Sequence, residues 1–430
     1  MVRPRPMPTL DRRTALKALL AATGLAATPG LAACGSGAAG SDAKSVTFGS
    51  NYSDAVPRQA IAAVLDGFKA KSGLGLSINT KDHETFQQQI NNYLQGHPDD
   101  VYTWFAGYRM RFFAAKGLAT DISDLWGQLG DNYTAAQREA STGDDGKQYF
   151  VPFYSYPWAL FYSKSTWSKH GYQVPKTFDE LIALGTRMRA DGLVALAAGQ
   201  SNGWPQLGTF DQLNFRTNGY EFHKSLMAGK EDWKGAKVRA VFDNWKRLLP
   251  LYQDNALGRK WEEAAQGVLA GTSGMMLIGS QQIGQQFAKK LDDLDFFAFP
   301  EIDPSFGTDT VEAPIDGFML SRKAANLDGG RKLLAYLSTP EAQLTYLKSD
   351  PTSIAASSKV DEGGYNELQR KCVEFVRNAK HITQFLDRDT DPGFAGDAMT
   401  NGINSFLQKP NEVDSVLSGI AEQAKSIFAK

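Results

Sequence analysis

The stretch DGKQYFVPFYSYPWALFYSK (residues 145–164) is dense in aromatic side chains and carries two prolines. Between Tyr149 and Tyr162, eight of fourteen residues are aromatic, against 11% of the whole chain. Pro152 and Pro157 fix the backbone and remove hydrogen-bond donors, so we expect no unbroken strand through them. This composition fits two interpretations, a bulky core strand or a surface that meets a flat, apolar ligand.

The first 33 residues have the pattern of an export signal. Five basic residues within the first 17 positions precede an apolar run, residues 18–33, that is too short to span a membrane. The run ends in Leu-Ala-Ala before Cys34, which resembles the bacterial lipobox, whose cysteine receives a diacylglycerol. We predict a signal peptide over 1–33, a lipid anchor at Cys34 and a tether over 34–44. An ordinary amphipathic N-terminal helix is the alternative.

The export route is left open between two systems. The segment DRRTALK (residues 11–17) resembles a twin-arginine motif, but Asp11 and Ala15 replace its usual Ser or Thr and Phe. Either a Tat-like or a Sec signal would place the mature chain on the outer face of the cytoplasmic membrane.

The remaining 397 residues are long enough for two domains with large cores. They carry 41 basic and 46 acidic side chains, a formal charge of −5, without a Lys/Arg-rich run. We therefore expect no nucleic-acid partner. Cys372 is the second of two cysteines, and it cannot form a disulfide if Cys34 is acylated. We expect a monomer.

Strand and helix patterns alternate along the mature chain. Residues 45–49 and 74–79 have strand patterns on either side of a helix pattern at 58–71, a β-α-β start typical of a parallel sheet. A further helix is expected at 210–217. The pattern predicts an α/β fold with at least two sheets.

Ligands of open α/β sheets bind at the carboxyl ends of strands. Those ends carry aromatic and hydrogen-bonding residues here, and no Gly-rich phosphate loop precedes a helix. The strand-end segments are NY (51–52), KDHE (81–84), WFAGY (104–108), NGW (202–204) and GSQ (279–281).

The sequence lacks the motifs of metal sites and of hydrolytic nucleophiles. The five histidines are dispersed, and neither HExxH, CxxC nor a Gly-x-Ser-x-Gly elbow occurs in the mature chain. We expect no metal, no cofactor and no catalytic residue. Paired carboxylates of a glycoside hydrolase are the open alternative. Their first candidates are Asp99, Asp100, Asp316 and Asp387.

The recurring feature is an aromatic residue beside hydrogen-bonding groups. A sugar presents a CH-rich face to an aromatic platform and a belt of hydroxyls to polar partners. We therefore predict a sugar-binding site. Its expected members are Asn51, Asp82, Glu84, Trp104, Tyr108, Tyr154, Trp158, Trp204 and Asp316.

Several short motifs occur in a fixed order along the chain. They are PDDV (98–101), AAKGL (114–118), DGK (145–147), FYSK (161–164), PKTFDEL (175–181), DGF (316–318) and STPEAQ (338–343). In this order and spacing they resemble the extracellular solute-binding lipoproteins of ABC importers, family 1, the carbohydrate-binding group related to maltose-binding protein. Two residues differ from the usual pattern of that family: Ser163 replaces Asn, and Gln281 replaces an aromatic residue.

The resemblance implies a binding protein without a chemical step. Two α/β lobes would close on the sugar about hinge strands and present it to an ABC permease. Lobe 1 would comprise 45–152 and 314–381, and lobe 2 would comprise 153–300 and 385–430. The chain would cross between lobes near 151–153, 300–314 and 382–385.

The resemblance also places Asp387 and Arg388 at the cleft. Arg388 would contact two sugar hydroxyls and Asp387 would orient it. A surface ion pair that contributes little is the alternative. Within the aromatic stretch, Tyr154 and Trp158 are the residues expected to face the ligand. A secreted glycoside hydrolase, or the same fold binding a polyamine, a metal chelate or another solute, are the alternative functions.

Overall fold

A computed structural model describes residues 44–429 of the chain. The predicted signal peptide and the lipidation site Cys34 lie outside the described residues. The described residues form one compact unit. This unit contains mixed sheets with helices between the strands, which confirms the predicted α/β fold.

The larger sheet has six strands in the order β11-β4-β10-β3-β1-β2. Strand β1 pairs in parallel with β2 and β3, whereas β10 runs antiparallel to both β3 and β4. The strands span β1 Ser45–Ser50, β2 Gly75–Thr80, β3 Val101–Phe105, β4 Phe150–Ser155, β10 Ile315–Leu320 and β11 Ile354–Ala355. The first three strands thus form the predicted β-α-β start.

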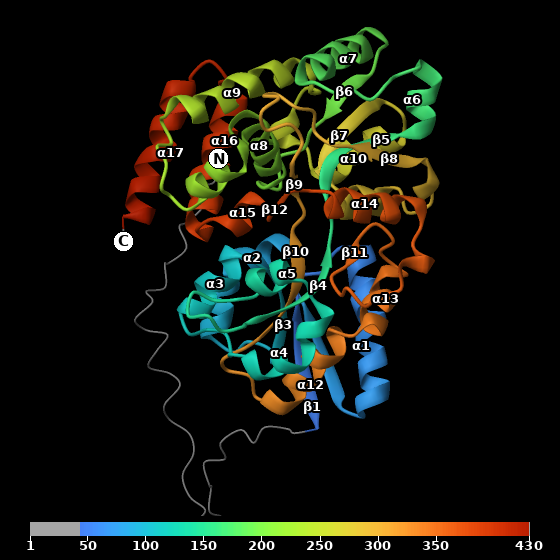
Figure 1. Cartoon of the computed structure of the whole chain (residues 1–430), viewed down its shortest axis with the longest axis vertical. Helices are drawn as coiled ribbons and strands as arrows, with labels where there is room; N and C mark the ends of the chain where they lie inside the picture. The colour runs from blue at the N-terminus through green and yellow to red at the C-terminus, as the bar shows by residue number, and fades with distance from the viewer. Residues whose placement is uncertain (1–43, 430) are drawn as a thin grey trace, which may run out of the picture. The chain divides into compact units, whose positions relative to one another are not determined.

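Helices connect or flank these strands, and the longest of them, α1, α2 and α12, are amphipathic and bury one face. They span α1 Ala55–Ser72, α2 His83–Gln95, α3 Tyr108–Ala115, α4 Ser123–Leu129, η1 Gly130–Asn132, α5 Ala135–Ala140, α12 Leu327–Leu337, α13 Pro340–Leu347 and η5 Glu362–Gly364. Figure 1 shows α1, α3, α4 and α12 around this sheet in the lower part of the view.

The smaller sheet has four strands in the order β6-β7-β5-β8. They span β5 Trp158–Ser163, β6 Val194–Ala197, β7 Ser273–Gly279 and β8 Leu294–Phe297. Its helices include α6 Lys164–His170, α7 Phe178–Ala190, α8 Pro205–Met227, α9 Ala236–Leu248, η2 Leu249–Leu251, η3 Ala256–Gly258, α10 Trp261–Leu269, α11 Ser280–Gln286 and η4 Leu291–Asp293. The C-terminal helices are α14 Glu367–Arg377, α15 Leu386–Asp389, η6 Phe394–Met399, α16 Thr400–Gln408 and α17 Val413–Phe428.

A two-stranded ribbon accompanies the passages between the sheets. It pairs β9 (Thr310–Glu312) in parallel with β12 (His381–Thr383). Strand β9 connects β8 of the small sheet with β10 of the large sheet, within the segment predicted for the second crossing. Helix α14, predicted for lobe 1, lies beside β8, where Lys371 donates to the carbonyl oxygen of Phe296 at 2.7 Å. The division into two lobes stays a prediction.

The aromatic stretch is shared between both sheets. Strand β4 belongs to the large sheet and β5 to the small one, so the chain passes between them at Tyr156 and Pro157. This passage between the sheets lies a few residues beyond 151–153, where the crossing between lobes is predicted. Pro152, expected to interrupt a strand, lies inside β4, because the register of β4 against β10 shifts beside it and tolerates the missing donor.

Helix α8 begins at Pro205, a favoured residue for the first turn, ahead of the helix predicted at 210–217. It reaches Met227 only across a kink at Gly219, whose φ of 79° and ψ of 172° are not helical, so the predicted helix ends close to this break. Many of its buried residues are polar, among them Gln206, Asp211 and Arg216. An apolar repeat therefore identifies only part of this helix. In the part of the chain that the structure describes, no helix has the length and apolarity needed to cross a membrane.

Candidate functional site

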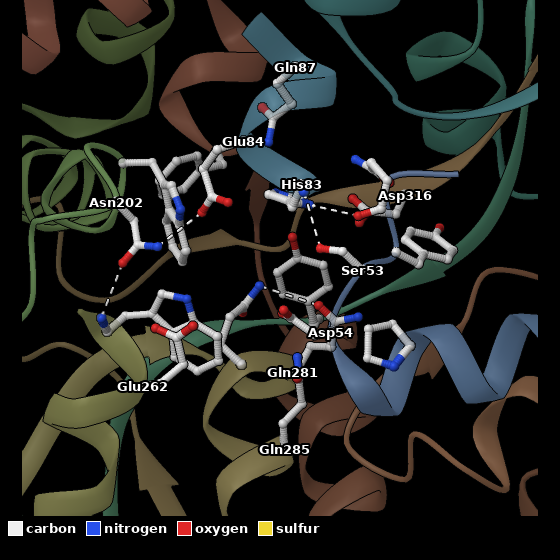
Figure 2. Close-up of a pocket in the computed structure, with 18 of the residues that line it drawn as sticks. Ser53, Asp54, His83, Glu84, Gln87, Asn202, Glu262, Gln281, Gln285 and Asp316 are labelled. Atoms are coloured by element: carbon white, nitrogen blue, oxygen red, sulfur yellow. Dashed lines mark hydrogen bonds between the residues drawn. The ribbon is translucent and has the colours of Figure 1, made fainter. Parts of the chain in front are cut away.

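A cavity of about 220 Å³ lies where strand ends of both sheets meet helices α2, α11 and α15. Asn51 follows β1 and Tyr154 lies in β4, whereas Trp158 begins β5 of the other sheet. Figure 2 shows polar side chains converging on this cavity, including Glu84, Asn202, Gln281 and Asp316. The site is therefore assembled from segments that are far apart in the sequence.

Nine of the eleven residues predicted to bind ligand line this cavity. They are Asn51, Asp82, Glu84, Tyr154, Trp158, Trp204, Asp316, Asp387 and Arg388. The expectation that ligands bind at the carboxyl ends of strands thus predicted most of this lining, because the carboxyl ends of β1, β2 and β6 lie beside the cavity.

The other two predicted residues lie elsewhere. Trp104 is 1% exposed and packs in an aromatic core, with its ring 5.5 Å from Phe113 and 6.2 Å from Phe86. It belongs to a strand, and its side chain lies on the face covered by helices. Tyr108 lines a separate cavity of about 840 Å³ together with Arg111 and His381. Neither side chain is part of the smaller cavity's lining.

An ion pair between Arg388 and Asp316 forms the floor of the cavity. Both side chains are at most 7% exposed, and Arg388 Nη1 donates to Asp316 Oδ1. Arg388 Nη2 donates to the hydroxyl of Tyr156 at 3.0 Å, and the guanidinium lies 3.9 Å from the centre of the Phe105 ring. Burial raises the pKa of Asp316, while Arg388 opposes that shift. Each charge therefore depends on the other.

Hydrogen bonds extend this floor from the six-stranded sheet to helix α11. The hydroxyl of Tyr154 donates to Asp316 Oδ2 at 3.0 Å, and Gln281 Nε2 donates to the Tyr154 oxygen at 3.1 Å. Gln281 also donates to Asp350 at 3.2 Å. Gln281, which replaces the family's frequent aromatic residue, thus connects α11 with β4 by hydrogen bonds.

The alternative interpretation of Asp387 and Arg388 as a surface ion pair is wrong, because the Arg388 side chain is 7% exposed and therefore buried. Arg109 Nη1 lies 3.2 Å from Asp387 Oδ2, whereas Arg388 Nε lies 3.7 Å from Asp387 Oδ1. The second distance is too long for a hydrogen bond. Asp316 rather than Asp387 therefore orients the arginine.

Aromatic rings form one wall. Trp158 stacks on Phe385 with ring centroids 4.8 Å apart, and Trp204 meets Trp158 edge-on at 6.2 Å. A Cβ at Gly208 would lie only 2.4 Å from the Trp158 ring, so a glycine in α8 permits this position of the indole. The wall thus brings two indole N–H groups without a protein partner, those of Trp158 and Trp204, to the cavity.

Buried polar atoms without a partner gather around the cavity. Among the described residues, half of the buried side-chain nitrogen and oxygen atoms that lack a hydrogen bond belong to its lining. The side chain of Asn51 is the clearest case, since it is 0% exposed and neither its Nδ2 nor its Oδ1 has a partner. Trp158 Nε1, Trp204 Nε1, Asp387 Oδ1 and Arg388 Nε are in the same condition. Buried polar groups of this kind are costly unless a ligand or water pairs them.

The rim of the cavity is acidic and more exposed. Asp82 caps α2 by accepting from Thr85 N at 2.9 Å, and the bonds from Thr85 hold the pKa of Asp82 below its usual value. Burial raises the pKa of Asp54 and of Glu262, and the charge of Glu84 raises both further. Asn202 Nδ2 donates to Glu84 Oε1 at 3.0 Å.

Several lining residues were missed by sequence reasoning. Asn202, Gln281 and Tyr52 belong to strand-end segments that the sequence did mark, although none was selected. Trp261 and Glu262 lie at the start of a helix, where no strand pattern precedes them. Phe385 lies in the segment 384–388, which the family resemblance places along the cleft, and it lines the cavity. Within residues 44–429, no group of three or more His, Cys, Asp or Glu side chains is arranged to hold a metal ion.

The sequence matches the family model for bacterial extracellular solute-binding protein over residues 53–344. The chain belongs to this family. The membership confirms the resemblance found from the short motifs. The solute-binding protein is 28% identical over 381 residues to the "alpha-glucosides-binding periplasmic protein AglE" of Rhizobium meliloti, covering 82% of this chain and 81% of AglE.

Other relatives are matched over less of their length. An uncharacterized ABC transporter extracellular-binding protein of Pyrococcus horikoshii is 26% identical over 67% of this chain and 65% of its own. A probable sugar-binding periplasmic protein of Mesorhizobium japonicum is 30% identical over 46% of this chain and 49% of its own. This chain thus spans less than two thirds of these two relatives.

Solved structures agree with the fold over nearly the whole described chain. The bacterial solute receptor AcbH is 44% identical with a TM-score of 0.88, covering 89% of this chain and 99% of AcbH. AcbH has an exclusive substrate preference for β-D-galactopyranose. A chitin oligosaccharide binding protein is 18% identical with a TM-score of 0.81, covering 90% and 99%, and shows the shared fold alone.

Proposed function

We propose that this solute-binding protein binds a single pyranose sugar, with galactose as the first candidate, and delivers it to an ABC import permease. The ligand would occupy the 220 Å³ cavity, against the Trp158 wall and above the Arg388–Asp316 floor. No chemical step is required, because the family it belongs to binds solutes.

The unpartnered buried atoms of the cavity carry this proposal. They include donors, the indole N–H groups of Trp158 and Trp204, and an acceptor, Asp387 Oδ1, beside the Asn51 amide, which offers one of each kind. A hydroxyl both donates and accepts, so a ring of hydroxyls satisfies such a mixed set. A polyamine offers only donors when protonated, and a carboxylate or phosphate offers mainly acceptors, so neither fits as well.

The small volume favours one ring over several. Pockets for drug-sized ligands measure roughly 300–1,000 Å³, and this cavity of about 220 Å³ is smaller. The related receptor AcbH is described as preferring a monosaccharide, β-D-galactopyranose, whereas AglE is named for α-glucosides. The cavity volume supports a monosaccharide as the ligand of this chain.

We propose hinge closure about the β9–β12 ribbon and the Tyr156–Pro157 passage as the mechanism. The cavity takes residues from both sheets, so a ligand held there contacts both lobes at once. Such a ligand stabilises the closed form over the open form, and a permease that binds the closed form would select the loaded protein.

A thermal-shift screen with galactose, glucose, mannose, lactose and raffinose tests the ligand class. A ligand that binds only the folded protein stabilises it by RT ln(1 + [L]/Kd), about 2.7 kcal/mol at a hundred times Kd. We expect the largest rise in Tm with galactose. Spermidine and a metal chelate serve as the non-sugar comparison, and product analysis of each sugar after incubation tests for hydrolysis. A protein that no sugar stabilises, or that cleaves one, would refute the proposal.

We further propose that Cys34 carries a diacylglycerol, which anchors the protein to the outer face of the cytoplasmic membrane. The lipobox-like ending before Cys34 supports this. Replacing Cys34 by Ser is expected to release the protein from the membrane fraction, because one cysteine provides the acylation site. Cys372→Ser is the matched control, since its thiol is buried in the fold. Membrane retention of the Cys34→Ser protein would contradict the anchor.

A further inference from the structure

The lining of the cavity divides by exposure into a floor and a rim. The floor consists of side chains at most 8% exposed, such as Asn51, Trp158 and Arg388. Glu84 and Asn202 are only partly buried although they line the same cavity, so they belong to its rim. The exposed residues Asp54, Asp82 and Lys260 complete this rim, and a ligand that enters or leaves between Glu84 and Asn202 has to part these two side chains.

The two rim residues come from opposite sides of the cavity. Glu84 lies in the first turn of α2, which connects β2 and β3 of the six-stranded sheet. Asn202 lies between β6 of the four-stranded sheet and helix α8. Asn202 Nδ2 donates to Glu84 Oε1 at 3.0 Å, and Figure 2 shows the two side chains pointing toward one another. This single bond thus connects the elements of both sheets at the rim.

Each partner is held in place by its own segment. The turn that carries Asn202 is fixed by Gly203, whose φ of 85° favours glycine, and by Gln200 Nε2, which donates to the Gly203 carbonyl at 2.9 Å. Glu84 lies at a helix N-terminus, where a carboxylate is favoured, and Asp82 caps that helix. The backbone that carries each partner is therefore held in place.

We propose that the Glu84–Asn202 hydrogen bond is a latch that closes the cavity over one sugar ring and excludes a second, linked ring. This inference rests on the proposed sugar-binding function and names the residues that limit ligand length. A glycosidic extension leaving the cavity past these residues would have to break the bond. The same bond delays release of a monosaccharide, because the mouth opens only after the bond breaks.

Four variants in the full mature protein test the latch: Asn202→Ala, Glu84→Ala, Glu84→Gln and Gln89→Ala. The two alanine variants of the latch remove the bond. Glu84→Gln retains an oxygen acceptor and so separates hydrogen bonding from charge. Gln89 lies on the same helix as Glu84, is exposed and is absent from the cavity lining, which makes it the matched control.

Galactose and lactose are the probes, measured by calorimetric titration and by stopped-flow dissociation followed through tryptophan fluorescence. We expect wild type to bind galactose and to give no detectable binding of lactose. Asn202→Ala and Glu84→Ala are expected to release galactose about tenfold faster, the effect of losing one hydrogen bond to a charged group, and to gain measurable lactose binding. Glu84→Gln is expected to stay within about threefold of wild type, and Gln89→Ala to match it.

The outcomes separate the latch from the function on which it rests. Unchanged galactose dissociation in both alanine variants, or lactose binding by wild type, overturns the latch and leaves sugar binding intact. Wild type that binds neither galactose nor any other sugar of the panel overturns both proposals. An effect of Gln89→Ala equal to that of Glu84→Ala also overturns the latch, since it would reflect the helix and not the bond.

Discussion

The floor and the rim of the cavity are built from different kinds of interaction. On the floor, Arg388 and Asp316 form a buried ion pair with hydrogen bonds to two tyrosines. On the rim, the acidic residues are partly or fully exposed, and the 3.0 Å bond between Glu84 and Asn202 joins the two sides. Substitutions on the floor are therefore expected to lower the stability of the fold, whereas substitutions on the rim should change that stability little.

The largest effect is expected from breaking the floor. Replacing Arg388 by Met leaves the Asp316 carboxylate buried without its partner, which costs roughly 3–5 kcal/mol. Urea unfolding should show this loss, and calorimetry should show no sugar binding. The double variant Arg388→Met/Asp316→Leu removes both charges and should recover most of the stability while binding stays absent. A single variant as stable as wild type would mean that the pair is not coupled to the fold.

A second test compares two buried tryptophans by exchanging each for Phe. Trp167 Nε1 donates to the Gly274 carbonyl at 2.7 Å, whereas Trp158 Nε1 has no partner in the protein. Trp167→Phe should therefore lose roughly 1–3 kcal/mol of stability with unchanged sugar affinity. Trp158→Phe should lose about tenfold in affinity, the effect of one hydrogen bond. Equal affinity losses in both variants would show that Trp158 acts by packing alone.

Carboxyls behind the floor should make stability depend on pH. Burial raises the pKa of Asp211 and of Glu312, and it raises that of Asp389 to about 7. The folded protein thus keeps protons that the unfolded chain releases near pH 4, so their contribution to stability is present at low pH and is lost as pH rises toward 7. The contribution of the rim residue Asp82 to stability depends on pH in the opposite direction. Its pKa is lowered in the folded protein, so this contribution is lost as pH falls.

Urea midpoints at pH 5 and pH 8 measure this dependence. Asp389→Asn removes one of the three titrating groups behind the floor, and its amide oxygen can still accept from Gln384 N, the bond that the carboxylate accepts at 3.0 Å. The variant should therefore lose less stability than wild type between the two pH values. The same change in both proteins would exclude Asp389 as a source of the dependence.

The smallest effect is expected at the rim. Asp82→Ala removes the cap of α2 and should cost about 1 kcal/mol of stability, whereas Asp82→Asn retains a capping oxygen and should cost less. Sugar affinity should fall less than in Glu84→Ala, since Asp82 bonds to its own helix and not across the cavity. A larger loss of affinity in Asp82→Asn than in Glu84→Ala would place the sugar against Asp82 and would weaken the proposed latch.

The carboxyl ends of the strands carry most of the residues that were correctly predicted to line the cavity. The residues predicted wrongly or not predicted have physical causes. Asn51 and Trp204 follow strands and line the cavity as predicted. The prediction for Trp104 failed because this residue lies within β3 and points into the core. All five residues of β3 are buried, so an alternation of apolar and polar residues does not show which side chains face the core. Trp261 and Glu262 were missed because they begin helix α10, which reaches the cavity only through folding.

The aromatic stretch separates what the sequence determines from what only the tertiary structure determines. Composition and order of motifs determined the α/β class, the family and the candidate residues Tyr154 and Trp158, because these follow from local pattern and from sequence similarity. Only the tertiary structure decided that β4 and β5 enter different sheets and that Arg388 hydrogen-bonds to Asp316 while its Nε stays 3.7 Å from Asp387. Glu84 and Asn202 also meet only in three dimensions, 118 residues apart in the chain. Such pairings depend on the distance between atoms that folding brings together, and no local pattern encodes that distance.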